Sequence, residues 1–225
     1  MNEDNQKGKP LNFSQATLGS KITIEKKLIE KYDIYAAKAK KTSKFAIFMS
    51  FILTSLSIKL FLNGNWVIGI ITIILALISL FLFFMFRGVA IGGAFESGLL
   101  VPGMIVNTNP IEIVVLANIS NSEDEQKKQY ACKKTKVKLP LHQITLGEKV
   151  PCVAMFGGAN NGIYTNFEPR PLVWACSSFE EITSEINRID QSDWEYLDVV
   201  KNKVPKLEEN QIALFNNNHE FTEVK

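Results

Sequence analysis

The stretch that decides the fold is FAIFMSFILTSLSIKLFLNGNWVIGIITIILALISLFLFFMF, residues 45–86. Its second half, residues 66–86, holds no charged residue, and a helix of this length spans roughly 31 Å, close to the ~30 Å hydrocarbon core of a bilayer. The first half, residues 45–62, carries Lys59, whose long side chain lies about one helical turn from the end and can reach the membrane interface. Asn63-Gly64-Asn65 separates the halves. The stretch therefore predicts a two-helix transmembrane hairpin.

Small and hydroxyl residues recur on one face of each predicted helix, because they are spaced three and four residues apart. In an antiparallel hairpin that turns at Gly64, Ser50 falls at the depth of Ser79, and Ser57 at that of Thr72. Such residues let helix backbones approach closely in lipid, so we interpret the two stripes as the seam of the hairpin. The alternative, that they line a polar path in an oligomer, stays open. The predicted seam residues are Ser50, Thr54, Ser57, Gly69, Thr72, Ala76 and Ser79.

Basic residues mark one end of the hairpin. Lysines crowd residues 31–44, whereas the turn at 63–65 has no positive charge. The positive-inside rule then places the N-terminus in the cytoplasm, and two crossings return the chain to the same side. We expect a multi-pass protein of the cell membrane, with two spans in contact with the lipid bilayer and with N- and C-termini cytoplasmic.

Charge and cysteine usage exclude several classes of protein. The 225 residues carry a net charge of +2, which argues against a dedicated nucleic-acid binder with its strong basic excess. Cys132, Cys152 and Cys176 are an odd number without Cys-x-x-Cys spacing. This pattern predicts buried thiols in a reducing compartment. It favours neither a disulfide framework nor a metal site. No cofactor is expected.

Composition divides the rest of the chain. Residues 1–13 are polar and are predicted to be a disordered tail. Residues 14–44 show the spacing of an amphipathic juxtamembrane helix, which either lies along the inner leaflet or extends the first span. Residues 87–98 hold four glycines and form a Gly-rich junction. Residues 99–205 are then a β-rich soluble domain with C-terminal helices, and residues 206–225 a second tail.

The soluble part combines short strand-like runs with two helices that follow them. Residues 111–119 are apolar on both faces, as in a central strand, and residues 130–139 alternate, as in a half-exposed strand. Ser178-x-x-Glu181 and Ser192-x-x-Glu195 are capping boxes that open two helices. The predicted fold class is α+β: a transmembrane hairpin followed by a small antiparallel β-barrel-like or curled-sheet domain, with two C-terminal helices packed on one side.

A Gly/Asn-rich segment within residues 157–170 is the candidate loop for a ligand or partner. Glycine permits unusual dihedral angles and leaves backbone amides open to a ligand, although a long turn is the simpler interpretation. The selected residues are Gly157, Gly158, Asn160, Asn161 and Arg170. No His-Glu-x-x-His, Gly-x-Ser-x-Gly or phosphate-loop motif occurs, so no catalytic residue is assigned.

Three segments, taken together, resemble a known family. They are LVPGMIV at residues 100–106, KVPCVAMFG at residues 149–157 and EPRPLVW at residues 168–174, with Trp194 after them. As a set they resemble a bacterial family of domains of unknown function, often fused to a short membrane hairpin, over about residues 88–205. The resemblance implies a bacterial protein with a compact β-rich domain. It implies no activity and no functional residue.

Three functions are compatible with these features. We favour a membrane-anchored cytoplasmic interaction or ligand-binding module, in which the hairpin localises the β-rich domain and the 157–170 loop binds an unknown protein or small molecule. The alternative is a subunit of a small oligomeric membrane channel or transport assembly, which requires a homo-oligomer. A membrane-associated enzyme is the third and least favoured function.

Overall fold

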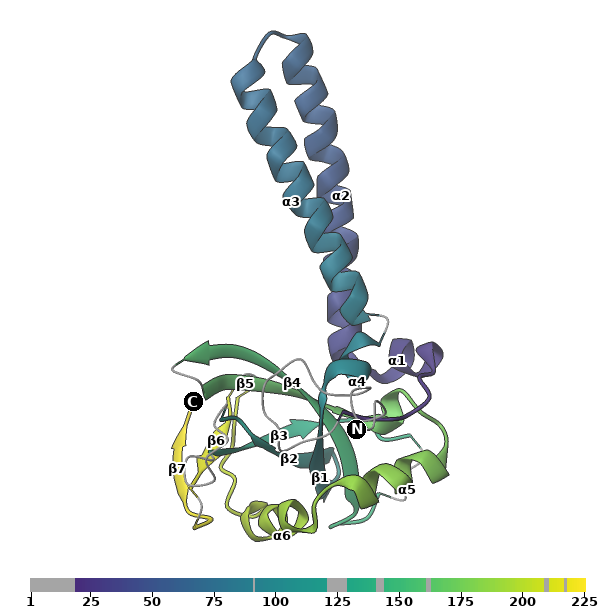
Figure 1. Ribbon diagram of the computed structural model, residues 1–225, viewed down its shortest axis with the longest axis vertical. Coiled ribbons are helices and arrows are strands. Elements are labelled where there is room, and N and C mark those ends of the chain that lie inside the picture. Colours follow the sequence, from purple (N-terminus) through teal and green to yellow (C-terminus); the bar gives the residue numbers. More distant parts are fainter. Residues whose placement is uncertain are drawn as a thin grey trace, which may run out of the picture. The chain divides into compact units, whose positions relative to one another are not determined.

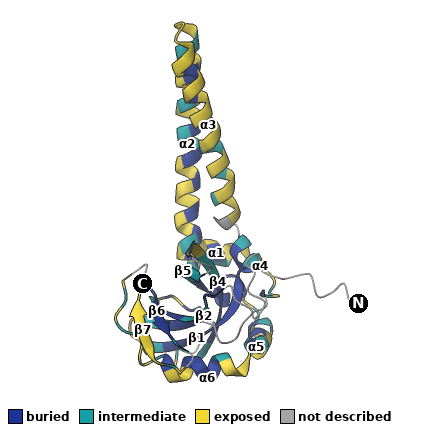
Figure 2. Ribbon diagram, turned by 60° about the vertical axis from the view of Figure 1, so that its left-hand side comes forward, coloured by how far each residue is buried: buried dark blue, intermediate teal, exposed yellow. Residues whose placement is uncertain are grey.

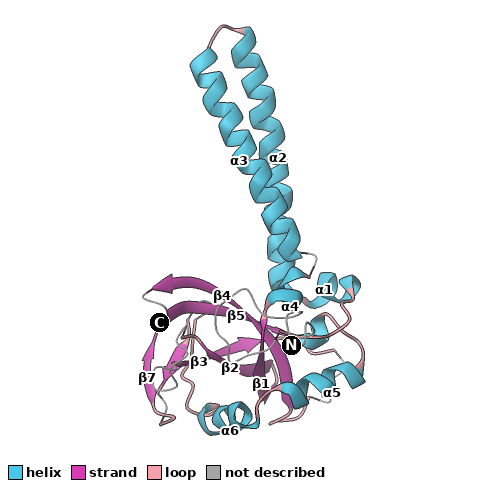
Figure 3. Cartoon of the chain, viewed as in Figure 1, coloured by secondary structure: helices cyan, strands magenta, loops and turns pink. Residues whose placement is uncertain are grey.

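The computed structural model describes residues 19–90, 92–120, 129–140, 144–160, 163–208, 211–216 and 218–225. The chain divides into two compact units. The hairpin unit is residues 33–93, and the β-domain is formed by residues 19–32 together with residues 94–225. The hairpin unit is therefore inserted into the chain of the β-domain. Figure 3 shows that the strands belong to the β-domain, whereas the hairpin unit is helical.

Two long helices, α2 (Ile34–Leu62) and α3 (Trp66–Ala90), form the hairpin unit. At the turn, Gly64 adopts a φ of +79°, in the left-handed region that glycine enters without steric cost. Both helices are long and apolar enough to cross a membrane. Most of their large apolar side chains are exposed, as the colouring in Figure 2 shows, so their outer faces suit a lipid environment.

The helix expected over residues 14–44 is broken at Asp33. The Asp33 carboxylate accepts hydrogen bonds from the backbone N–H groups of Tyr35 at 2.9 Å and Ala36 at 3.0 Å, and so begins a new helix. From there α2 runs through the expected first span without interruption. The last residues of the expected juxtamembrane helix thus extend that span, which is one of the two arrangements that the sequence left open.

Upstream of Asp33, the short helix α1 (Lys26–Tyr32) follows residues 20–25, which adopt no regular helix. The tail expected at residues 1–13 lies outside the described residues. Downstream, α3 passes Phe86 and ends at Ala90, so the first part of the expected Gly-rich junction is helical. Gly92, with a φ of +110°, then separates it from the short helix α4 (Gly93–Ser97).

The β-domain is built on a seven-stranded antiparallel sheet, drawn in Figure 1. The strand order is β5-β4-β1-β2-β3-β6-β7, with β1 near the centre because it pairs with both β2 and β4. The sheet is curled like half of a barrel, and the predicted α+β class with a curled antiparallel sheet is confirmed. The strands are β1 (Leu99–Thr108), β2 (Ile111–Asn118), β3 (Tyr130–Lys136), β4 (Lys149–Asn160), β5 (Ile163–Pro171), β6 (Ala213–Phe215) and β7 (Phe221–Val224).

Two helices, α5 (Phe179–Arg188) and α6 (Gln191–Val200), follow a short 3₁₀ turn, η3 (Leu172–Trp174). The Ser178 hydroxyl accepts a hydrogen bond from the backbone N–H of Glu181 at 3.2 Å, as the first capping box predicts. The second box is wrong, because α6 begins before Ser192. Tyr196 on α6 stacks on Tyr130 of β3 with ring centroids 4.4 Å apart, so α6 covers one face of the sheet.

Residues 206–225, expected to be a second tail, instead contribute β6 and β7 to the sheet. β6 pairs with β3 through Ala213 opposite Cys132 and Phe215 opposite Tyr130. Residues 212–215 are at most 1% exposed. A run of four apolar residues is too short to predict a strand by itself, and the partner strand lies far away in the sequence.

The segment before the hairpin unit packs into the β-domain. The carbonyl of Gly19 accepts a hydrogen bond from Arg188 Nη2 at 3.1 Å, and Gly19 forms a β-bridge with Leu99. The backbone N–H of Glu25 donates to the carbonyl of Ala175 at 2.7 Å, and the side chain of Ile29 is fully buried. The β-domain therefore depends on residues from both sides of the hairpin unit.

Candidate functional site

The predicted loop is a two-stranded ribbon made by β4 and β5. The two strands pair from Cys152 opposite Pro171 to Asn160 opposite Ile163. Gly157, Gly158 and Asn160 are therefore strand residues of β4, and the loop interpretation is corrected for them. Asn161 lies outside the described residues.

A close cross-strand contact explains one of the glycines. Gly158 adopts a φ of +62°, and a Cβ atom at this position would collide with Thr165 Oγ1 on β5. Glycine is thus favoured at position 158 by its left-handed conformation and by the Thr165 side chain beside it. The glycine that is typical of a ligand-binding loop is explained here by a left-handed backbone conformation and by the side chain of Thr165 on the neighbouring strand.

The ribbon has a buried root and an exposed far end. Phe167 at the root is fully buried, whereas Gly157, Gly158 and Thr165 farther out are exposed. Between them, the rings of Phe156 and Tyr164 stack with centroids 4.8 Å apart. This aromatic pair stiffens the ribbon and leaves both rings half-buried, so that they can contact another molecule.

Arg170 lies at the root of the ribbon, opposite Val153 of β4 and only 1% exposed. Its Nη2 forms an ion pair with Glu168 Oε2 at 2.9 Å on the same face of β5. The structure does not bring Arg170 to the glycines, which pair several positions farther along β4. Arg170 is therefore a structural residue of the root.

Lys133 on β3, which the sequence did not single out, is 4% exposed and reaches across the curled sheet to β5. Its Nζ donates to Asn166 Oδ1 at 3.1 Å and to the carbonyl of Phe167 at 3.2 Å. In the sheet order, β4, β1 and β2 lie between β3 and β5. The sequence contains one sign that Lys133 is buried, namely the adjacent Lys134. Adjacent residues of a strand point to opposite faces of the sheet, so one lysine of this pair must face the interior.

A backbone contact joins β5 to the end of β2. The backbone N–H of Tyr164 donates to the carbonyl of Ile119 at 2.9 Å, and Ile163 forms a β-bridge with Ser120. Together with the Lys133 contacts, it holds β5 against the β2–β3 side of the curled sheet, at one point through backbone and at another through a side chain. The β5 strand of the ribbon is thus held both near its root, at Phe167, and near its far end, at Ile163 and Tyr164. The exposed residues Gly157, Gly158 and Thr165 form the candidate binding surface.

The three cysteines are buried free thiols. Burial raises the pKa of the Cys132 and Cys152 thiols far above their ordinary value, and raises the pKa of Cys176 to about 11. A hydrogen bond from the backbone N–H of Thr23 lowers the pKa of Glu181, next to Cys176. Within the described residues, no group of three or more His, Cys, Asp and Glu side chains is placed to hold a metal ion.

The structure places the seam residues between α2 and α3. Three serines donate across to a backbone carbonyl of the other helix: Ser50 to Ala76 at 3.1 Å, Ser57 to Gly69 at 2.8 Å and Ser79 to Ala46 at 2.7 Å. These pairs are shifted by about one helical turn from those expected for a turn at Gly64.

The two threonines of the stripe bond within their own helices. Thr54 donates to the carbonyl of Ser50 at 2.8 Å, and Thr72 to that of Gly69 at 2.9 Å. At Gly69, a Cβ atom would lie 2.9 Å from the ring of Phe61, so glycine lets that ring lie close against α3. Ser43, which was not selected, adds a further contact across the seam by donating to the carbonyl of Phe83 at 3.4 Å.

Fold and site together define an α+β protein in which a curled antiparallel β-domain carries an inserted hairpin of two apolar helices. The chain belongs to the family described as "Protein of unknown function (DUF3239)", which matches residues 89–205, and the resemblance noted from the sequence is confirmed. A crystal structure described as a "putative membrane protein" from Corynebacterium diphtheriae is similar over 46% of this chain and 88% of its own, at 24% identity and a TM-score of 0.39. A search of curated proteins found no match.

Proposed function

We propose that this protein is a membrane-anchored interaction module. The hairpin unit crosses the cell membrane twice, the β-domain and both termini lie in the cytoplasm, and the far end of the β4–β5 ribbon binds a protein partner. The observation that carries this proposal is the insertion of the hairpin unit into the β-domain. Because residues 19–32 and 94–225 form one unit, both ends of the hairpin leave the membrane on the same side.

The basic residues support the cytoplasmic orientation. Residues 34–90 contain no Asp or Glu, and their basic residues apart from Lys59 lie before Phe45 on α2 or at Arg87 on α3. All of these mark the end of the hairpin unit that is joined to the β-domain. By the positive-inside rule this end faces the cytoplasm.

The seam supports an anchor over a channel. The hydroxyl protons of Ser50, Ser57 and Ser79 are used in hydrogen bonds between the helices of one chain. A helix pair joined in this way needs no second copy to satisfy its polar stripe.

The edge of β4 supports a protein as the partner. β1 pairs with β4 only from Lys149 to Ala154, so the edge of β4 from Met155 to Asn160 has no neighbouring strand in the described part of the chain. An open strand edge beside the half-buried rings of Phe156 and Tyr164 suits the addition of a strand from another protein, because main-chain hydrogen bonds supply affinity and side chains supply specificity.

Cysteine labelling tests the topology. An Asn65→Cys variant places a thiol in the exposed turn, and a Glu223→Cys variant places one on β7 of the β-domain. With a membrane-impermeant maleimide, we expect Asn65→Cys to react on intact cells and Glu223→Cys to react only after permeabilisation. The wild-type chain, whose buried thiols react slowly, is the control. Labelling of both variants from one side would contradict the two crossings.

Photo-crosslinking tests the ribbon. A photoreactive residue at exposed Thr165 should give a discrete adduct with one protein in cells of the native host, and the same residue at exposed Lys138 is the matched control. The adduct should weaken when Tyr164→Ser removes the aromatic ring beside it. Equal adducts from both positions, or none from Thr165, would count against the ribbon as the binding surface.

A further inference from the structure

Three basic side chains lie on one flank of the hairpin seam. Lys40 and Lys44 on α2 each follow a buried seam residue, Ala39 and Ser43, by one position. On α3, the carbonyl of Phe83 accepts the hydrogen bond from Ser43. Arg87 lies one helical turn after Phe83. In antiparallel helices, positions that follow the seam on each helix fall on the same side of it. All three side chains are exposed, and the flank is therefore a cationic surface shared by both helices.

The depth of this flank matches the level of lipid headgroups. Residues 45–62 of α2 and residues 66–86 of α3 span roughly 27 Å and 31 Å, close to the ~30 Å hydrocarbon core. With the turn at one interface, Lys44 and Arg87 both reach the other. Arg87 is also held near the seam, because its guanidinium lies 5.7 Å from the centre of the Phe83 ring.

We propose that this flank, formed by Lys40, Lys44 and Arg87, binds the phosphate group of an anionic phospholipid. The inference rests on the proposed function, because the depth argument requires the hairpin to cross the membrane. An arginine offers a fork of donors that matches phosphate oxygens, and the two lysines supply further positive charge. A zwitterionic headgroup carries its own cation and fits the flank less well.

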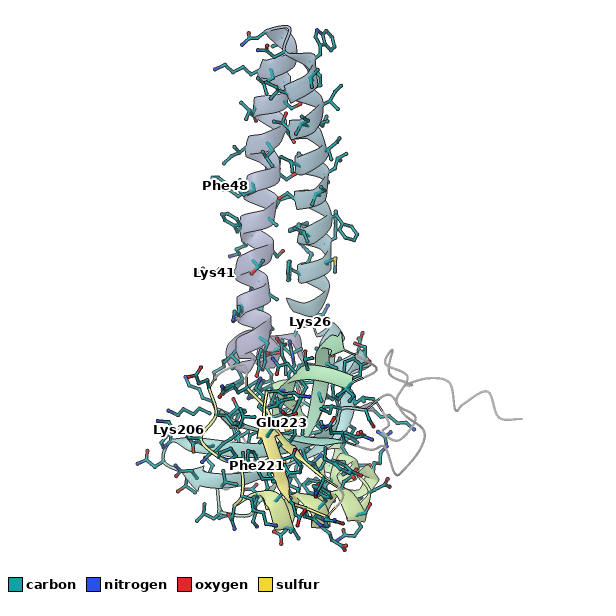
Figure 4. The ribbon with its side chains drawn as sticks, turned by 90° about the vertical axis from the view of Figure 1, so that its left-hand side faces the viewer. Lys26, Lys41, Phe48, Lys206, Phe221 and Glu223 are labelled. Atoms are coloured by element: carbon teal, nitrogen blue, oxygen red, sulfur yellow. The ribbon has the colours of Figure 1, made fainter. Side chains whose placement is uncertain are left out.

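The test measures lipid binding to the purified full chain in detergent by native mass spectrometry. We expect the wild-type chain to bind phosphatidylglycerol about tenfold more tightly than phosphatidylcholine, with the preference weakening in salt. The Lys40→Gln/Lys44→Gln/Arg87→Gln variant should lose the preference. A control with the same change of charge, Lys136→Gln/Lys138→Gln/Lys206→Gln, alters exposed lysines of the β-domain and should keep it. Lys206 is labelled in Figure 4, as is Lys41 near the basic end of α2.

Each other outcome overturns the inference. Equal loss in the control variant means that net charge alone attracts the lipid. Displacement of phosphatidylglycerol by inorganic phosphate at equal concentration means that the flank is a site for free anions. If the glutamine variant fails to fold, the Lys40→Arg/Lys44→Arg/Arg87→Lys variant keeps the charges and should keep the lipid preference. Loss of the preference in that variant contradicts the phosphate site.

Carbonate extraction separates the two proposals. A wild-type chain that is extracted from membranes overturns the proposed function, whereas a retained chain without lipid preference overturns only the phosphate site.

Discussion

The hairpin unit and the β-domain are stabilised by contacts of very different reach along the chain. In the hairpin unit, the hydrogen bonds that join α2 to α3 connect residues 12 to 40 positions apart. In the β-domain, Arg188 bonds to Gly19 across 169 positions. Local spacing therefore carries most of the information for the hairpin, whereas the β-domain is closed by residues whose sequence neighbourhoods give little sign of their partners.

Phe215 and Phe221 form the sharpest contrast within the β-domain. They are paired across β6 and β7, yet Phe215 is 1% exposed and Phe221 is 44% exposed. We expect Phe215→Ala to lower the free energy of unfolding by about 3–5 kcal/mol. Replacement of Phe221, the residue labelled in Figure 4, by alanine should lower it by less than about 1 kcal/mol. Urea unfolding of the full chain in mild detergent, followed by tryptophan fluorescence, measures both. Equal small effects would mean that the C-terminal strands add little to the domain.

Lys133 and Lys134 provide the next contrast, because they are adjacent on β3 and face opposite ways. Lys133 is buried and bonds to β5, whereas Lys134 forms a partly exposed ion pair with Glu112 at 3.1 Å. Lys133→Met should cost about 1–3 kcal/mol of unfolding free energy, since the carbonyl of Phe167 loses its donor. Lys134→Met should cost less than about 1 kcal/mol. The same urea titration separates the two, and a reversed order would refute the role of Lys133 in holding β5 to the curled sheet.

These contrasts show where prediction from the sequence ends. The hairpin is predictable because charge-free apolar runs of spanning length have few soluble alternatives. The strands β2 and β3 and the capping box at Ser178 are predictable because their signals are local, whereas β6 and β7 are not. The contact of Lys133 with Asn166 depends on how far the sheet curls, which no local pattern encodes. The sequence favours a loop over the ribbon because glycine is typical both of loops and of strand positions with a left-handed conformation, as at Gly158.

Alkaline pH should weaken the β-domain. Burial raises the pKa of the Cys176 thiol from an ordinary value of 9.0 to about 11. The folded chain therefore keeps a proton that the unfolded chain releases, so this contribution to stability is full below pH 9 and is lost as the pH rises toward 11. We expect the unfolding free energy to fall by about 1 kcal/mol from this thiol by pH 10, and Cys176→Ala to make the fall shallower. Urea titrations at several pH values from neutral to alkaline measure it, and an unchanged slope in the variant would contradict the assignment.

The smallest expected effect lies in the seam of the hairpin unit. Ser50→Ala removes a hydrogen bond between the helices, and Ser55→Ala is its control, because Ser55 is exposed and donates within α2 to the carbonyl of Phe51 at 3.0 Å. In lipid or detergent, hydrogen bonds between helices contribute only about 0.6 kcal/mol on average, since the separated helices find other partners. We expect Ser50→Ala to weaken the hairpin by about that amount in a titration with denaturing detergent followed by the fluorescence of Trp66, and Ser55→Ala to leave it unchanged. A larger loss for Ser50→Ala would show that the seam is held more by polar contacts than by the close packing that Gly69 and Ala76 allow.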